Sequence, residues 1–148
     1  MGFPYTALTR TVITTTAAFS SNQVMGTGIQ SMSPIPQGGF IQSVEIDLNS
    51  TNASQIDFCM FTSSMPNTTF TDHSSIAVSS ADFASQGPIV NVTNWSYMGT
   101  NASNGFATAL GCAYPNQNSG ILYWALIARG AVTVNSTNGI SVAVTFVS

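Results

Sequence analysis

The sequence predicts an all-β protein, a single-domain antiparallel β-sandwich or jelly roll of about eight strands with one short helix. Residues 121–129 are eight apolar or aromatic residues followed by one arginine, and they lie between Gly120 and Gly130. Both faces of such a strand are apolar, so both must be covered, which places it inside a sandwich or a subunit contact. A short buried helix is the alternative, but the flanking glycines and the nine-residue length favour a strand.

Two further segments alternate as half-buried strands do. Residues 140–147 place four large apolar side chains on one face: Ile140, Val142, Val144 and Phe146. Residues 40–48 divide in the same way, with Ser43, Glu45 and Asp47 on the polar face. The opposite face of that segment carries Phe40, Val44, Ile46 and Leu48 together with Gln42. Residues 55–62 follow after a turn, and we expect them to pair with 40–48 as a β-hairpin.

The N-terminal part is predicted to hold one strand and a long irregular stretch. Residues 8–16 are dense in β-branched residues and predict the first strand. We expect residues 1–16 to form an N-terminal arm and this strand, with a role between subunits, and residues 17–148 to form the sandwich domain. Residues 17–38 are rich in small residues, Gly and Pro, which predicts a loop with a short strand at 23–25.

The second half of the chain alternates between predicted strands and turns. Residues 79–85 predict the short helix, with Ser79 as its N-cap and Asp82 three residues later in an incomplete capping box. Residues 89–98 and 106–113 predict two more strands. Regularly spaced strands separated by such turn signals are typical of a sandwich or jelly roll.

Charge is scarce in this chain of 148 residues, with 5% charged residues against an average of about 25%. Arg10 and Arg129 are the basic residues, and nucleic-acid binding needs several such phosphate contacts, so it is excluded as a function. The formal charge of −3 is too small for long-range steering of a partner. A surface with so little charge is weakly protected against self-association, which indicates a surface covered in an assembly.

Cellular location is predicted from what the sequence does not contain. The first residues show neither a basic nor an apolar leader segment, and no apolar run is long enough to cross a membrane. We therefore expect synthesis in a cytoplasm, no membrane association and no glycosylation at the Asn-x-Ser/Thr triplets. Cys59 and Cys112 are predicted to be buried free thiols, with a disulfide between them as the alternative.

Candidate catalytic and metal-binding residues are few. His73 is the only histidine and follows Asp72, but it lacks further ligands and is predicted to be an exposed loop residue. Glu45 and Asp47 share a strand face and, with Asp57, are the candidates for a pair of glycosidase carboxylates.

Asp47, Asn49 and Thr51 faintly resemble a calcium loop that lacks its glycine and closing glutamate. We therefore predict no catalytic, cofactor-binding or metal-binding residues and no enzymatic activity.

Five aromatic residues are candidates for a sugar-binding platform. Most of them lie in predicted strands, where packing in the core or between subunits is the commoner use of an aromatic side chain. We therefore favour packing over sugar binding for this set: Trp95, Tyr97, Tyr114, Tyr123 and Trp124.

The order of segments over residues 17–148 resembles a family of tailed-phage virion proteins, the small head decoration or cement proteins. The resemblance lies in the succession of segments and not in one invariant motif. The segments are 18–26, 38–48 (Gly-Gly-Phe-Ile-Gln-Ser-Val-Glu-Ile-Asp-Leu), 56–61 (Ile-Asp-Phe-Cys-Met-Phe), 68–83, 89–95, 122–134 (Leu-Tyr-Trp-Ala-Leu-Ile-Ala-Arg-Gly-Ala-Val-Thr-Val) and 139–147.

The resemblance implies a non-enzymatic virion structural protein without a cofactor, a bacteriophage cement protein on the outer surface of the major capsid lattice. Its partner would be the major capsid protein, and we expect a homo-oligomer, a dimer or trimer, that stabilises the head. The expected location is the capsid surface of the virion after synthesis in the host cytoplasm. The alternative is a receptor- or glycan-binding module of a phage head or tail fibre, and a third option is a secreted adhesin or pilin-like subunit.

Overall fold

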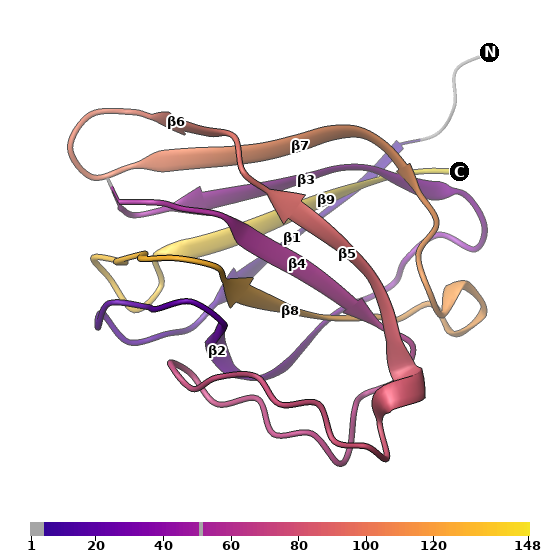
Figure 1. The fold of residues 1–148 in the computed structure, drawn as a ribbon. Coiled ribbons are helices and arrows are strands. Elements are labelled where there is room, and N and C mark those ends of the chain that lie inside the picture. Colours follow the sequence, from indigo (N-terminus) through magenta and orange to yellow (C-terminus); the bar gives the residue numbers. More distant parts are fainter. Residues whose placement is uncertain (1–4, 51) are drawn as a thin grey trace.

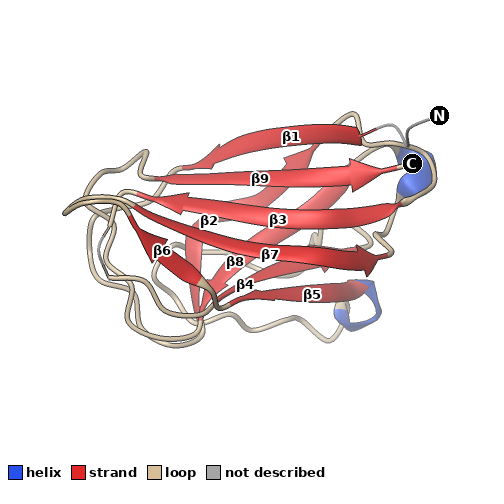
Figure 2. Cartoon of the chain, turned by 90° about the horizontal axis from the view of Figure 1, so that it is seen from above, coloured by secondary structure: helices blue, strands red, loops and turns tan. Residues whose placement is uncertain are grey.

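Two antiparallel sheets pack face to face in the computed structural model, which describes residues 5–50 and 52–148 (Figures 1 and 2). Sheet I has the strand order β1-β9-β3-β7-β6 and sheet II the order β2-β8-β4-β5. The predicted all-β antiparallel sandwich is confirmed. The strands are β1 Tyr5–Val12, β2 Gln23–Met32, β3 Phe40–Leu48, β4 Ile56–Phe61, β5 Gln86–Val92, β6 Trp95–Tyr97, β7 Ser103–Cys112, β8 Leu122–Ala128 and β9 Ile140–Val147.

The strand pairing is that of a jelly roll. β1 pairs with β9, β2 with β8, β3 with β7 and β4 with β5, all antiparallel. The first half of the chain is thus paired along its length with the second half, and the pairs alternate between the two sheets, as in the two Greek keys of a jelly roll. The short strand β6 extends sheet I beyond β7.

Strand β8 is covered on both faces, as its sequence predicts. Leu122, Trp124 and Leu126 point into the core between the sheets, where each is fully buried. Ala125 and Ile127 point to the other face and belong to a second apolar cluster. The strand lies between β2 and β4 in the middle of sheet II, which is where a strand that is apolar on both faces belongs.

The outer face of sheet II is covered by residues 62–85, which we call the covering segment (the pink loop along the lower edge of Figure 1). Met65 and Phe70 of this segment are buried, and Ile76 packs against the same cluster. Phe70 meets Phe61 of β4 edge to face, with ring centroids 5.5 Å apart. The covering segment therefore gives the protein a second, smaller core.

Both strands of the N-terminal part differ from the prediction. β1 spans Tyr5–Val12 and not 8–16, because it pairs with β9 at eight positions within the same chain. β2 spans Gln23–Met32, although residues 17–38 were predicted to be mostly loop. Gly26 and Gly28 adopt positive φ inside this strand, and the register shifts between Met25 and Gln30. The glycines that indicated a loop form a bulge within a strand.

The predicted hairpin of residues 40–48 and 55–62 does not form, because β3 and β4 lie in different sheets. All six residues of β4 are buried, so this strand needs cover on both faces, whereas β3 keeps a polar face toward solvent. A bulge between Ile41 and Ser43 also changes the inward set of β3. Ile41 is buried there, while Phe40, predicted inward, is 37% exposed.

The remaining corrections concern residues 79–98. The predicted helix is a three-residue 3-10 turn, Phe83–Ser85, with Asp82 in the cap position and no side-chain capping bond. A second 3-10 turn spans Gln117–Ser119. Residues 89–98 are not one strand, because β5 and β6 belong to different sheets.

No helix in the described part of the chain is long and apolar enough to cross a membrane.

Candidate functional site

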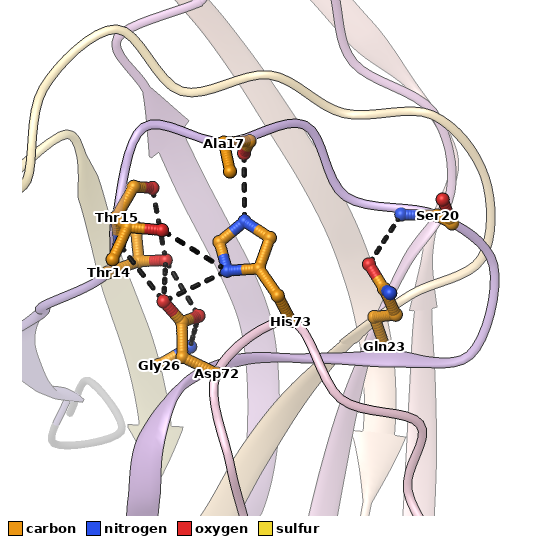
Figure 3. A network of polar contacts seen from close by, with 8 residues as sticks. All are labelled: Thr14, Thr15, Ala17, Ser20, Gln23, Gly26, Asp72 and His73. Carbon is orange, nitrogen blue, oxygen red and sulfur yellow. Dashed lines mark hydrogen bonds and ion pairs between the residues drawn. The ribbon is translucent and has the colours of Figure 1, made fainter.

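Asp72 is the centre of a polar network that joins three segments distant in sequence (Figure 3). The Thr14 hydroxyl donates to the carboxylate at 2.7 Å, and the Gly26 and Thr15 amides donate to it at 2.8 and 3.0 Å. Burial alone would raise the pKa of Asp72, but these hydrogen bonds and the adjacent imidazole outweigh it and hold the pKa below its usual value. The carboxylate thereby fastens the covering segment to the residues after β1 and to β2.

His73 is half-buried and not the exposed loop residue that was predicted. Its side chain is 17% exposed and stacks on Phe19, with ring centroids 3.7 Å apart. Nδ1 lies 3.0 Å from Asp72, and Nε2 lies 2.8 Å from the carbonyl oxygen of Ala17 (Figure 3). Because both ring nitrogens face groups of the chain itself, neither is free to bind a metal or to relay a proton to a substrate.

Two of the three candidate glycosidase carboxylates share a strand face, as predicted, and the third lies in the other sheet. Glu45 and Asp47 lie on the outer face of sheet I, where the Asn104 side-chain amide donates to both, at 2.9 and 2.7 Å. Asp57 lies in sheet II and pairs with Arg129 at 2.6 Å. Burial acts to raise the pKa of Asp57, but its side-chain hydrogen bonds and the guanidinium hold the pKa below its usual value.

The five aromatic residues do not form a platform. Trp124 is fully buried between the sheets and stacks on Phe58 with centroids 5.2 Å apart. Tyr114 is also buried and meets Phe146 edge to face at 5.0 Å. Tyr97, in contrast, is 52% exposed at the edge of sheet I. The remaining two pack partly buried on different clusters: Trp95 and Tyr123.

Both cysteines are free thiols in different sheets. Cys59 is buried in β4 under the covering segment, and burial raises its pKa to about 12. Cys112, at the end of β7, is only half-buried, although it was predicted to be buried. The calcium-like stretch includes Thr51, which lies outside the described residues. Within residues 5–50 and 52–148, no three His, Cys, Asp or Glu side chains are grouped to hold a metal ion.

The middle of the outer face of sheet I carries mostly short side chains. The register places Thr9, Ala143 and Phe106 in one row of this face and Ala7, Thr145 and Thr108 in the next. Glu45 in the first of these rows is the one charge among them, and Asn104 bonds to it. We call these two rows the bare face, because no segment in the described part of the chain covers them: Ala7, Thr9, Ser43, Glu45, Phe106, Thr108, Ala143 and Thr145.

Two of the hollows on the surface of the described residues bear on function. The first is apolar, lies beside Cys59, Ile89 and the covering segment, and has a volume of about 90 Å³, well below that of a typical ligand pocket. The second, which we call the polar groove, has a volume of about 310 Å³ at the end of the sandwich where β3 ends and β9 begins. Its polar side chains come from Asp47, Asn49, Asn101, Ser136, Asn138 and Ser141.

The polar groove was not predicted from the sequence. Its side chains come from three segments that are distant in sequence, in strand ends and the adjoining turns, and only the fold brings them together. The signal that was present is the number of asparagines in those turns, Asn49, Asn101 and Asn138, which composition alone explains equally well.

No model of a known protein family matches the chain, and a search of curated proteins found no match. The fold therefore defines the class of protein, an antiparallel jelly-roll sandwich, and a more particular function rests on the surfaces just described.

Proposed function

We propose that this protein has a structural role and no enzymatic activity. More particularly, we propose a bacteriophage capsid decoration or cement protein that binds the outer surface of the major capsid lattice and stabilises the head. It would act in the virion as a homo-oligomer, a dimer or trimer, after synthesis in the host cytoplasm. The observation that carries this proposal is the bare face, a sheet surface with mostly short side chains and one charged residue, Glu45.

A surface of this kind is suited to close contact with another protein. Alanine and threonine side chains are short, so a partner can approach the sheet closely over a wide area. Almost no charge has to leave water on contact, which removes the largest penalty for burying a polar surface. Phe106 lies at the β7 end of the face and is 41% exposed, so it supplies an aromatic side chain that an interface can bury.

The role proposed is mechanical. A cement protein bridges neighbouring capsomers and resists their separation, which requires a rigid body with more than one contact surface. The jelly roll supplies the rigidity, because two apolar clusters hold the sheets and the covering segment together. A homo-oligomer would repeat the bare face around a symmetry axis and so match a repeating lattice.

The test is binding to expanded phage heads that lack the protein. We expect saturable binding that follows the periodicity of the lattice, seen by cryo-electron microscopy. Thr145→Lys places a charge in the bare face and should lower the occupancy about tenfold or more. Ser80→Lys in the covering segment is exposed and should bind like the wild type. Absence of lattice-periodic binding, or equal occupancy of Thr145→Lys and wild type, would contradict the proposal.

The runner-up function, a receptor- or glycan-binding module of a head or tail fibre, is favoured by the polar groove. The number of copies per virion separates it from cement, because a lattice needs many copies and a fibre only a few.

A further inference from the structure

We propose that the polar groove binds a neutral saccharide. Three segments distant in sequence form the groove: the end of β3, the turn between β6 and β7, and the loop that leads into β9. This proposal goes beyond a cement role and does not depend on it.

The floor of the groove is held by backbone hydrogen bonds. The Asn49 amide donates to the carbonyl oxygen of Gly139 at 2.7 Å, and the Asn135 amide donates to that of Asn49 at 2.8 Å. The Gly139 amide donates to the carbonyl oxygen of Ser136 at 3.0 Å. A Cβ at Gly139 would lie 2.5 Å from the Val134 side chain, so glycine is needed there. A groove built in advance loses little conformational entropy when a ligand binds.

The opposite wall is fixed in the same way. The Met98 amide donates to the carbonyl oxygen of Ala102 at 2.8 Å, which closes the turn that carries Asn101. Both walls therefore present their side chains from hydrogen-bonded turns.

The polar groups in the groove suit a ligand that both donates and accepts hydrogen bonds. Oδ1 of Asp47 accepts from Asn104, and Oδ2 receives no donor from the described part of the chain. The side chains of Asn101, Asn138 and Ser141 likewise form no hydrogen bond with described residues. A carboxylate accepts strongly from hydroxyl groups, while amides and hydroxyls both donate and accept. Adjacent hydroxyl groups of a sugar ring can donate to the carboxylate and can both donate to and accept from the amides and the serine hydroxyl.

Charge and size restrict the ligand further. Asp47 is the one charged residue that lines the groove, and neither Arg10 nor Arg129 reaches it. Without a basic group, the groove disfavours phosphorylated, sialylated or uronic sugars. A calcium ion takes about six to eight oxygen ligands, usually from several carboxylates, and the groove supplies a single carboxylate. The volume of about 310 Å³ is at the lower end for ligand pockets and fits a mono- or disaccharide.

The experiment is a titration of the full chain, followed by NMR, with glucose, galactose, mannose, N-acetylglucosamine and lactose at millimolar concentrations. Sialic acid, glucuronic acid and Ca²⁺ alone serve as comparison ligands. We expect one or more neutral sugars to bind and the charged sugars not to bind. Asp47→Asn and Asn101→Ala should each weaken the affinity about tenfold or more, because the first replaces a charged acceptor oxygen by an amide donor and the second removes an amide.

Glu45→Gln is the matched control. Glu45 lies on the same strand face and bonds to the same Asn104 amide, but it does not line the groove, so its variant should bind sugar like the wild type. Thermal melts of all variants establish that they are folded. Asn101→Ala should leave shell occupancy unchanged and Thr145→Lys should leave sugar affinity unchanged, so this proposal and the cement proposal fail independently.

Four outcomes would overturn the proposal. No sugar in the panel binds, or Asp47→Asn binds as tightly as the wild type. Glu45→Gln weakens binding as much as Asp47→Asn does, which would place the ligand elsewhere on sheet I. Ca²⁺ alone shifts the groove resonances while the neutral sugars do not, which would make the groove a cation site.

Discussion

The outer faces of the two sheets differ in whether the chain itself covers them. Sheet II is apolar on its outer face, and the covering segment buries that face with Met65, Phe70 and Ile76. The bare face of sheet I carries mostly short polar and small apolar side chains, and nothing in the described part of the chain covers it. A sheet face that folding must bury is therefore distinguished by large apolar side chains, and the bare face lacks them apart from Phe106. The bare face is the one available to a partner.

The largest effect should come from removing an aromatic side chain from each face. Phe70→Ala should lower the free energy of unfolding by about 3–5 kcal/mol, because the side chain is 5% exposed and leaves a cavity beneath the covering segment. Phe106→Ala should lower it by less than about 1 kcal/mol, because this side chain is 41% exposed. Urea unfolding measures both. Equal losses of unfolding free energy in the two variants would contradict the distinction between a buried outer face on sheet II and an open one on sheet I.

A smaller effect should come from the attachment of the covering segment. Asp72→Asn puts an amide donor where the hydroxyl of Thr14 and the amides of Thr15 and Gly26 also donate, so at least one donor loses its partner. We expect a loss of about 1–3 kcal/mol at neutral pH. Asp47→Asn, on the exposed end of β3, is the control and should change stability by less than about 0.5 kcal/mol.

The same pair of variants gives a pH dependence. The pKa of Asp72 is lowered in the folded protein, so its contribution to stability is present above the unfolded value of about 3.9 and is lost as the pH falls below it. The difference in melting temperature between wild type and Asp72→Asn should therefore narrow below about pH 4. The pKa values of Asp57 and Asp82 are also lowered, so the wild type itself should lose stability in this range. A difference that stays constant with pH would contradict the role given to the Asp72 carboxylate.

The smallest effect concerns the reactivity of the two cysteine thiols and not the stability of the fold. Cys59 lies under the covering segment, and burial raises its pKa to about 12, so iodoacetamide should not modify it in the native protein at neutral pH. Cys112 is half-buried in sheet I and should react first. Mass spectrometry of the labelled protein identifies the site. Early labelling of Cys59 would show that the covering segment opens readily.

The sequence predicted the parts of the fold that depend on local pattern. The segments that form β3, β8 and β9 were predicted as strands from the pattern of their apolar residues. Alternating apolar residues indicate one buried face, and a continuous apolar run indicates two. The partners of these strands were not predictable in the same way. β3 and β4 are neighbours in sequence and look like a hairpin, but the choice of sheet depends on packing across the whole chain.

The candidate sites were less predictable than the strands, for the same reason. His73 looked exposed because its immediate neighbours are polar, whereas its burial comes from Thr15, Ala17 and Phe19, more than fifty residues earlier. β2 was predicted only as a short strand at 23–25, because Gly26 and Gly28 were taken as signs of a loop, although a bulge uses the same residues. Contacts between residues distant in sequence determine the burial of His73 and the strand conformation of β2. A single sequence does not show which distant residues are in contact.

The pairing of β1 with β9 has a practical consequence for engineering. Tyr5 lies opposite Val147, so the two ends of the described chain emerge side by side (Figure 1). Ser141, at the polar groove, is six residues back along β9, about 20 Å away at the usual rise of a strand. A peptide fused directly before Tyr5 or after Ser148 would therefore be displayed away from the groove. A short linker from Ser148 to Tyr5 would also permit circular permutation.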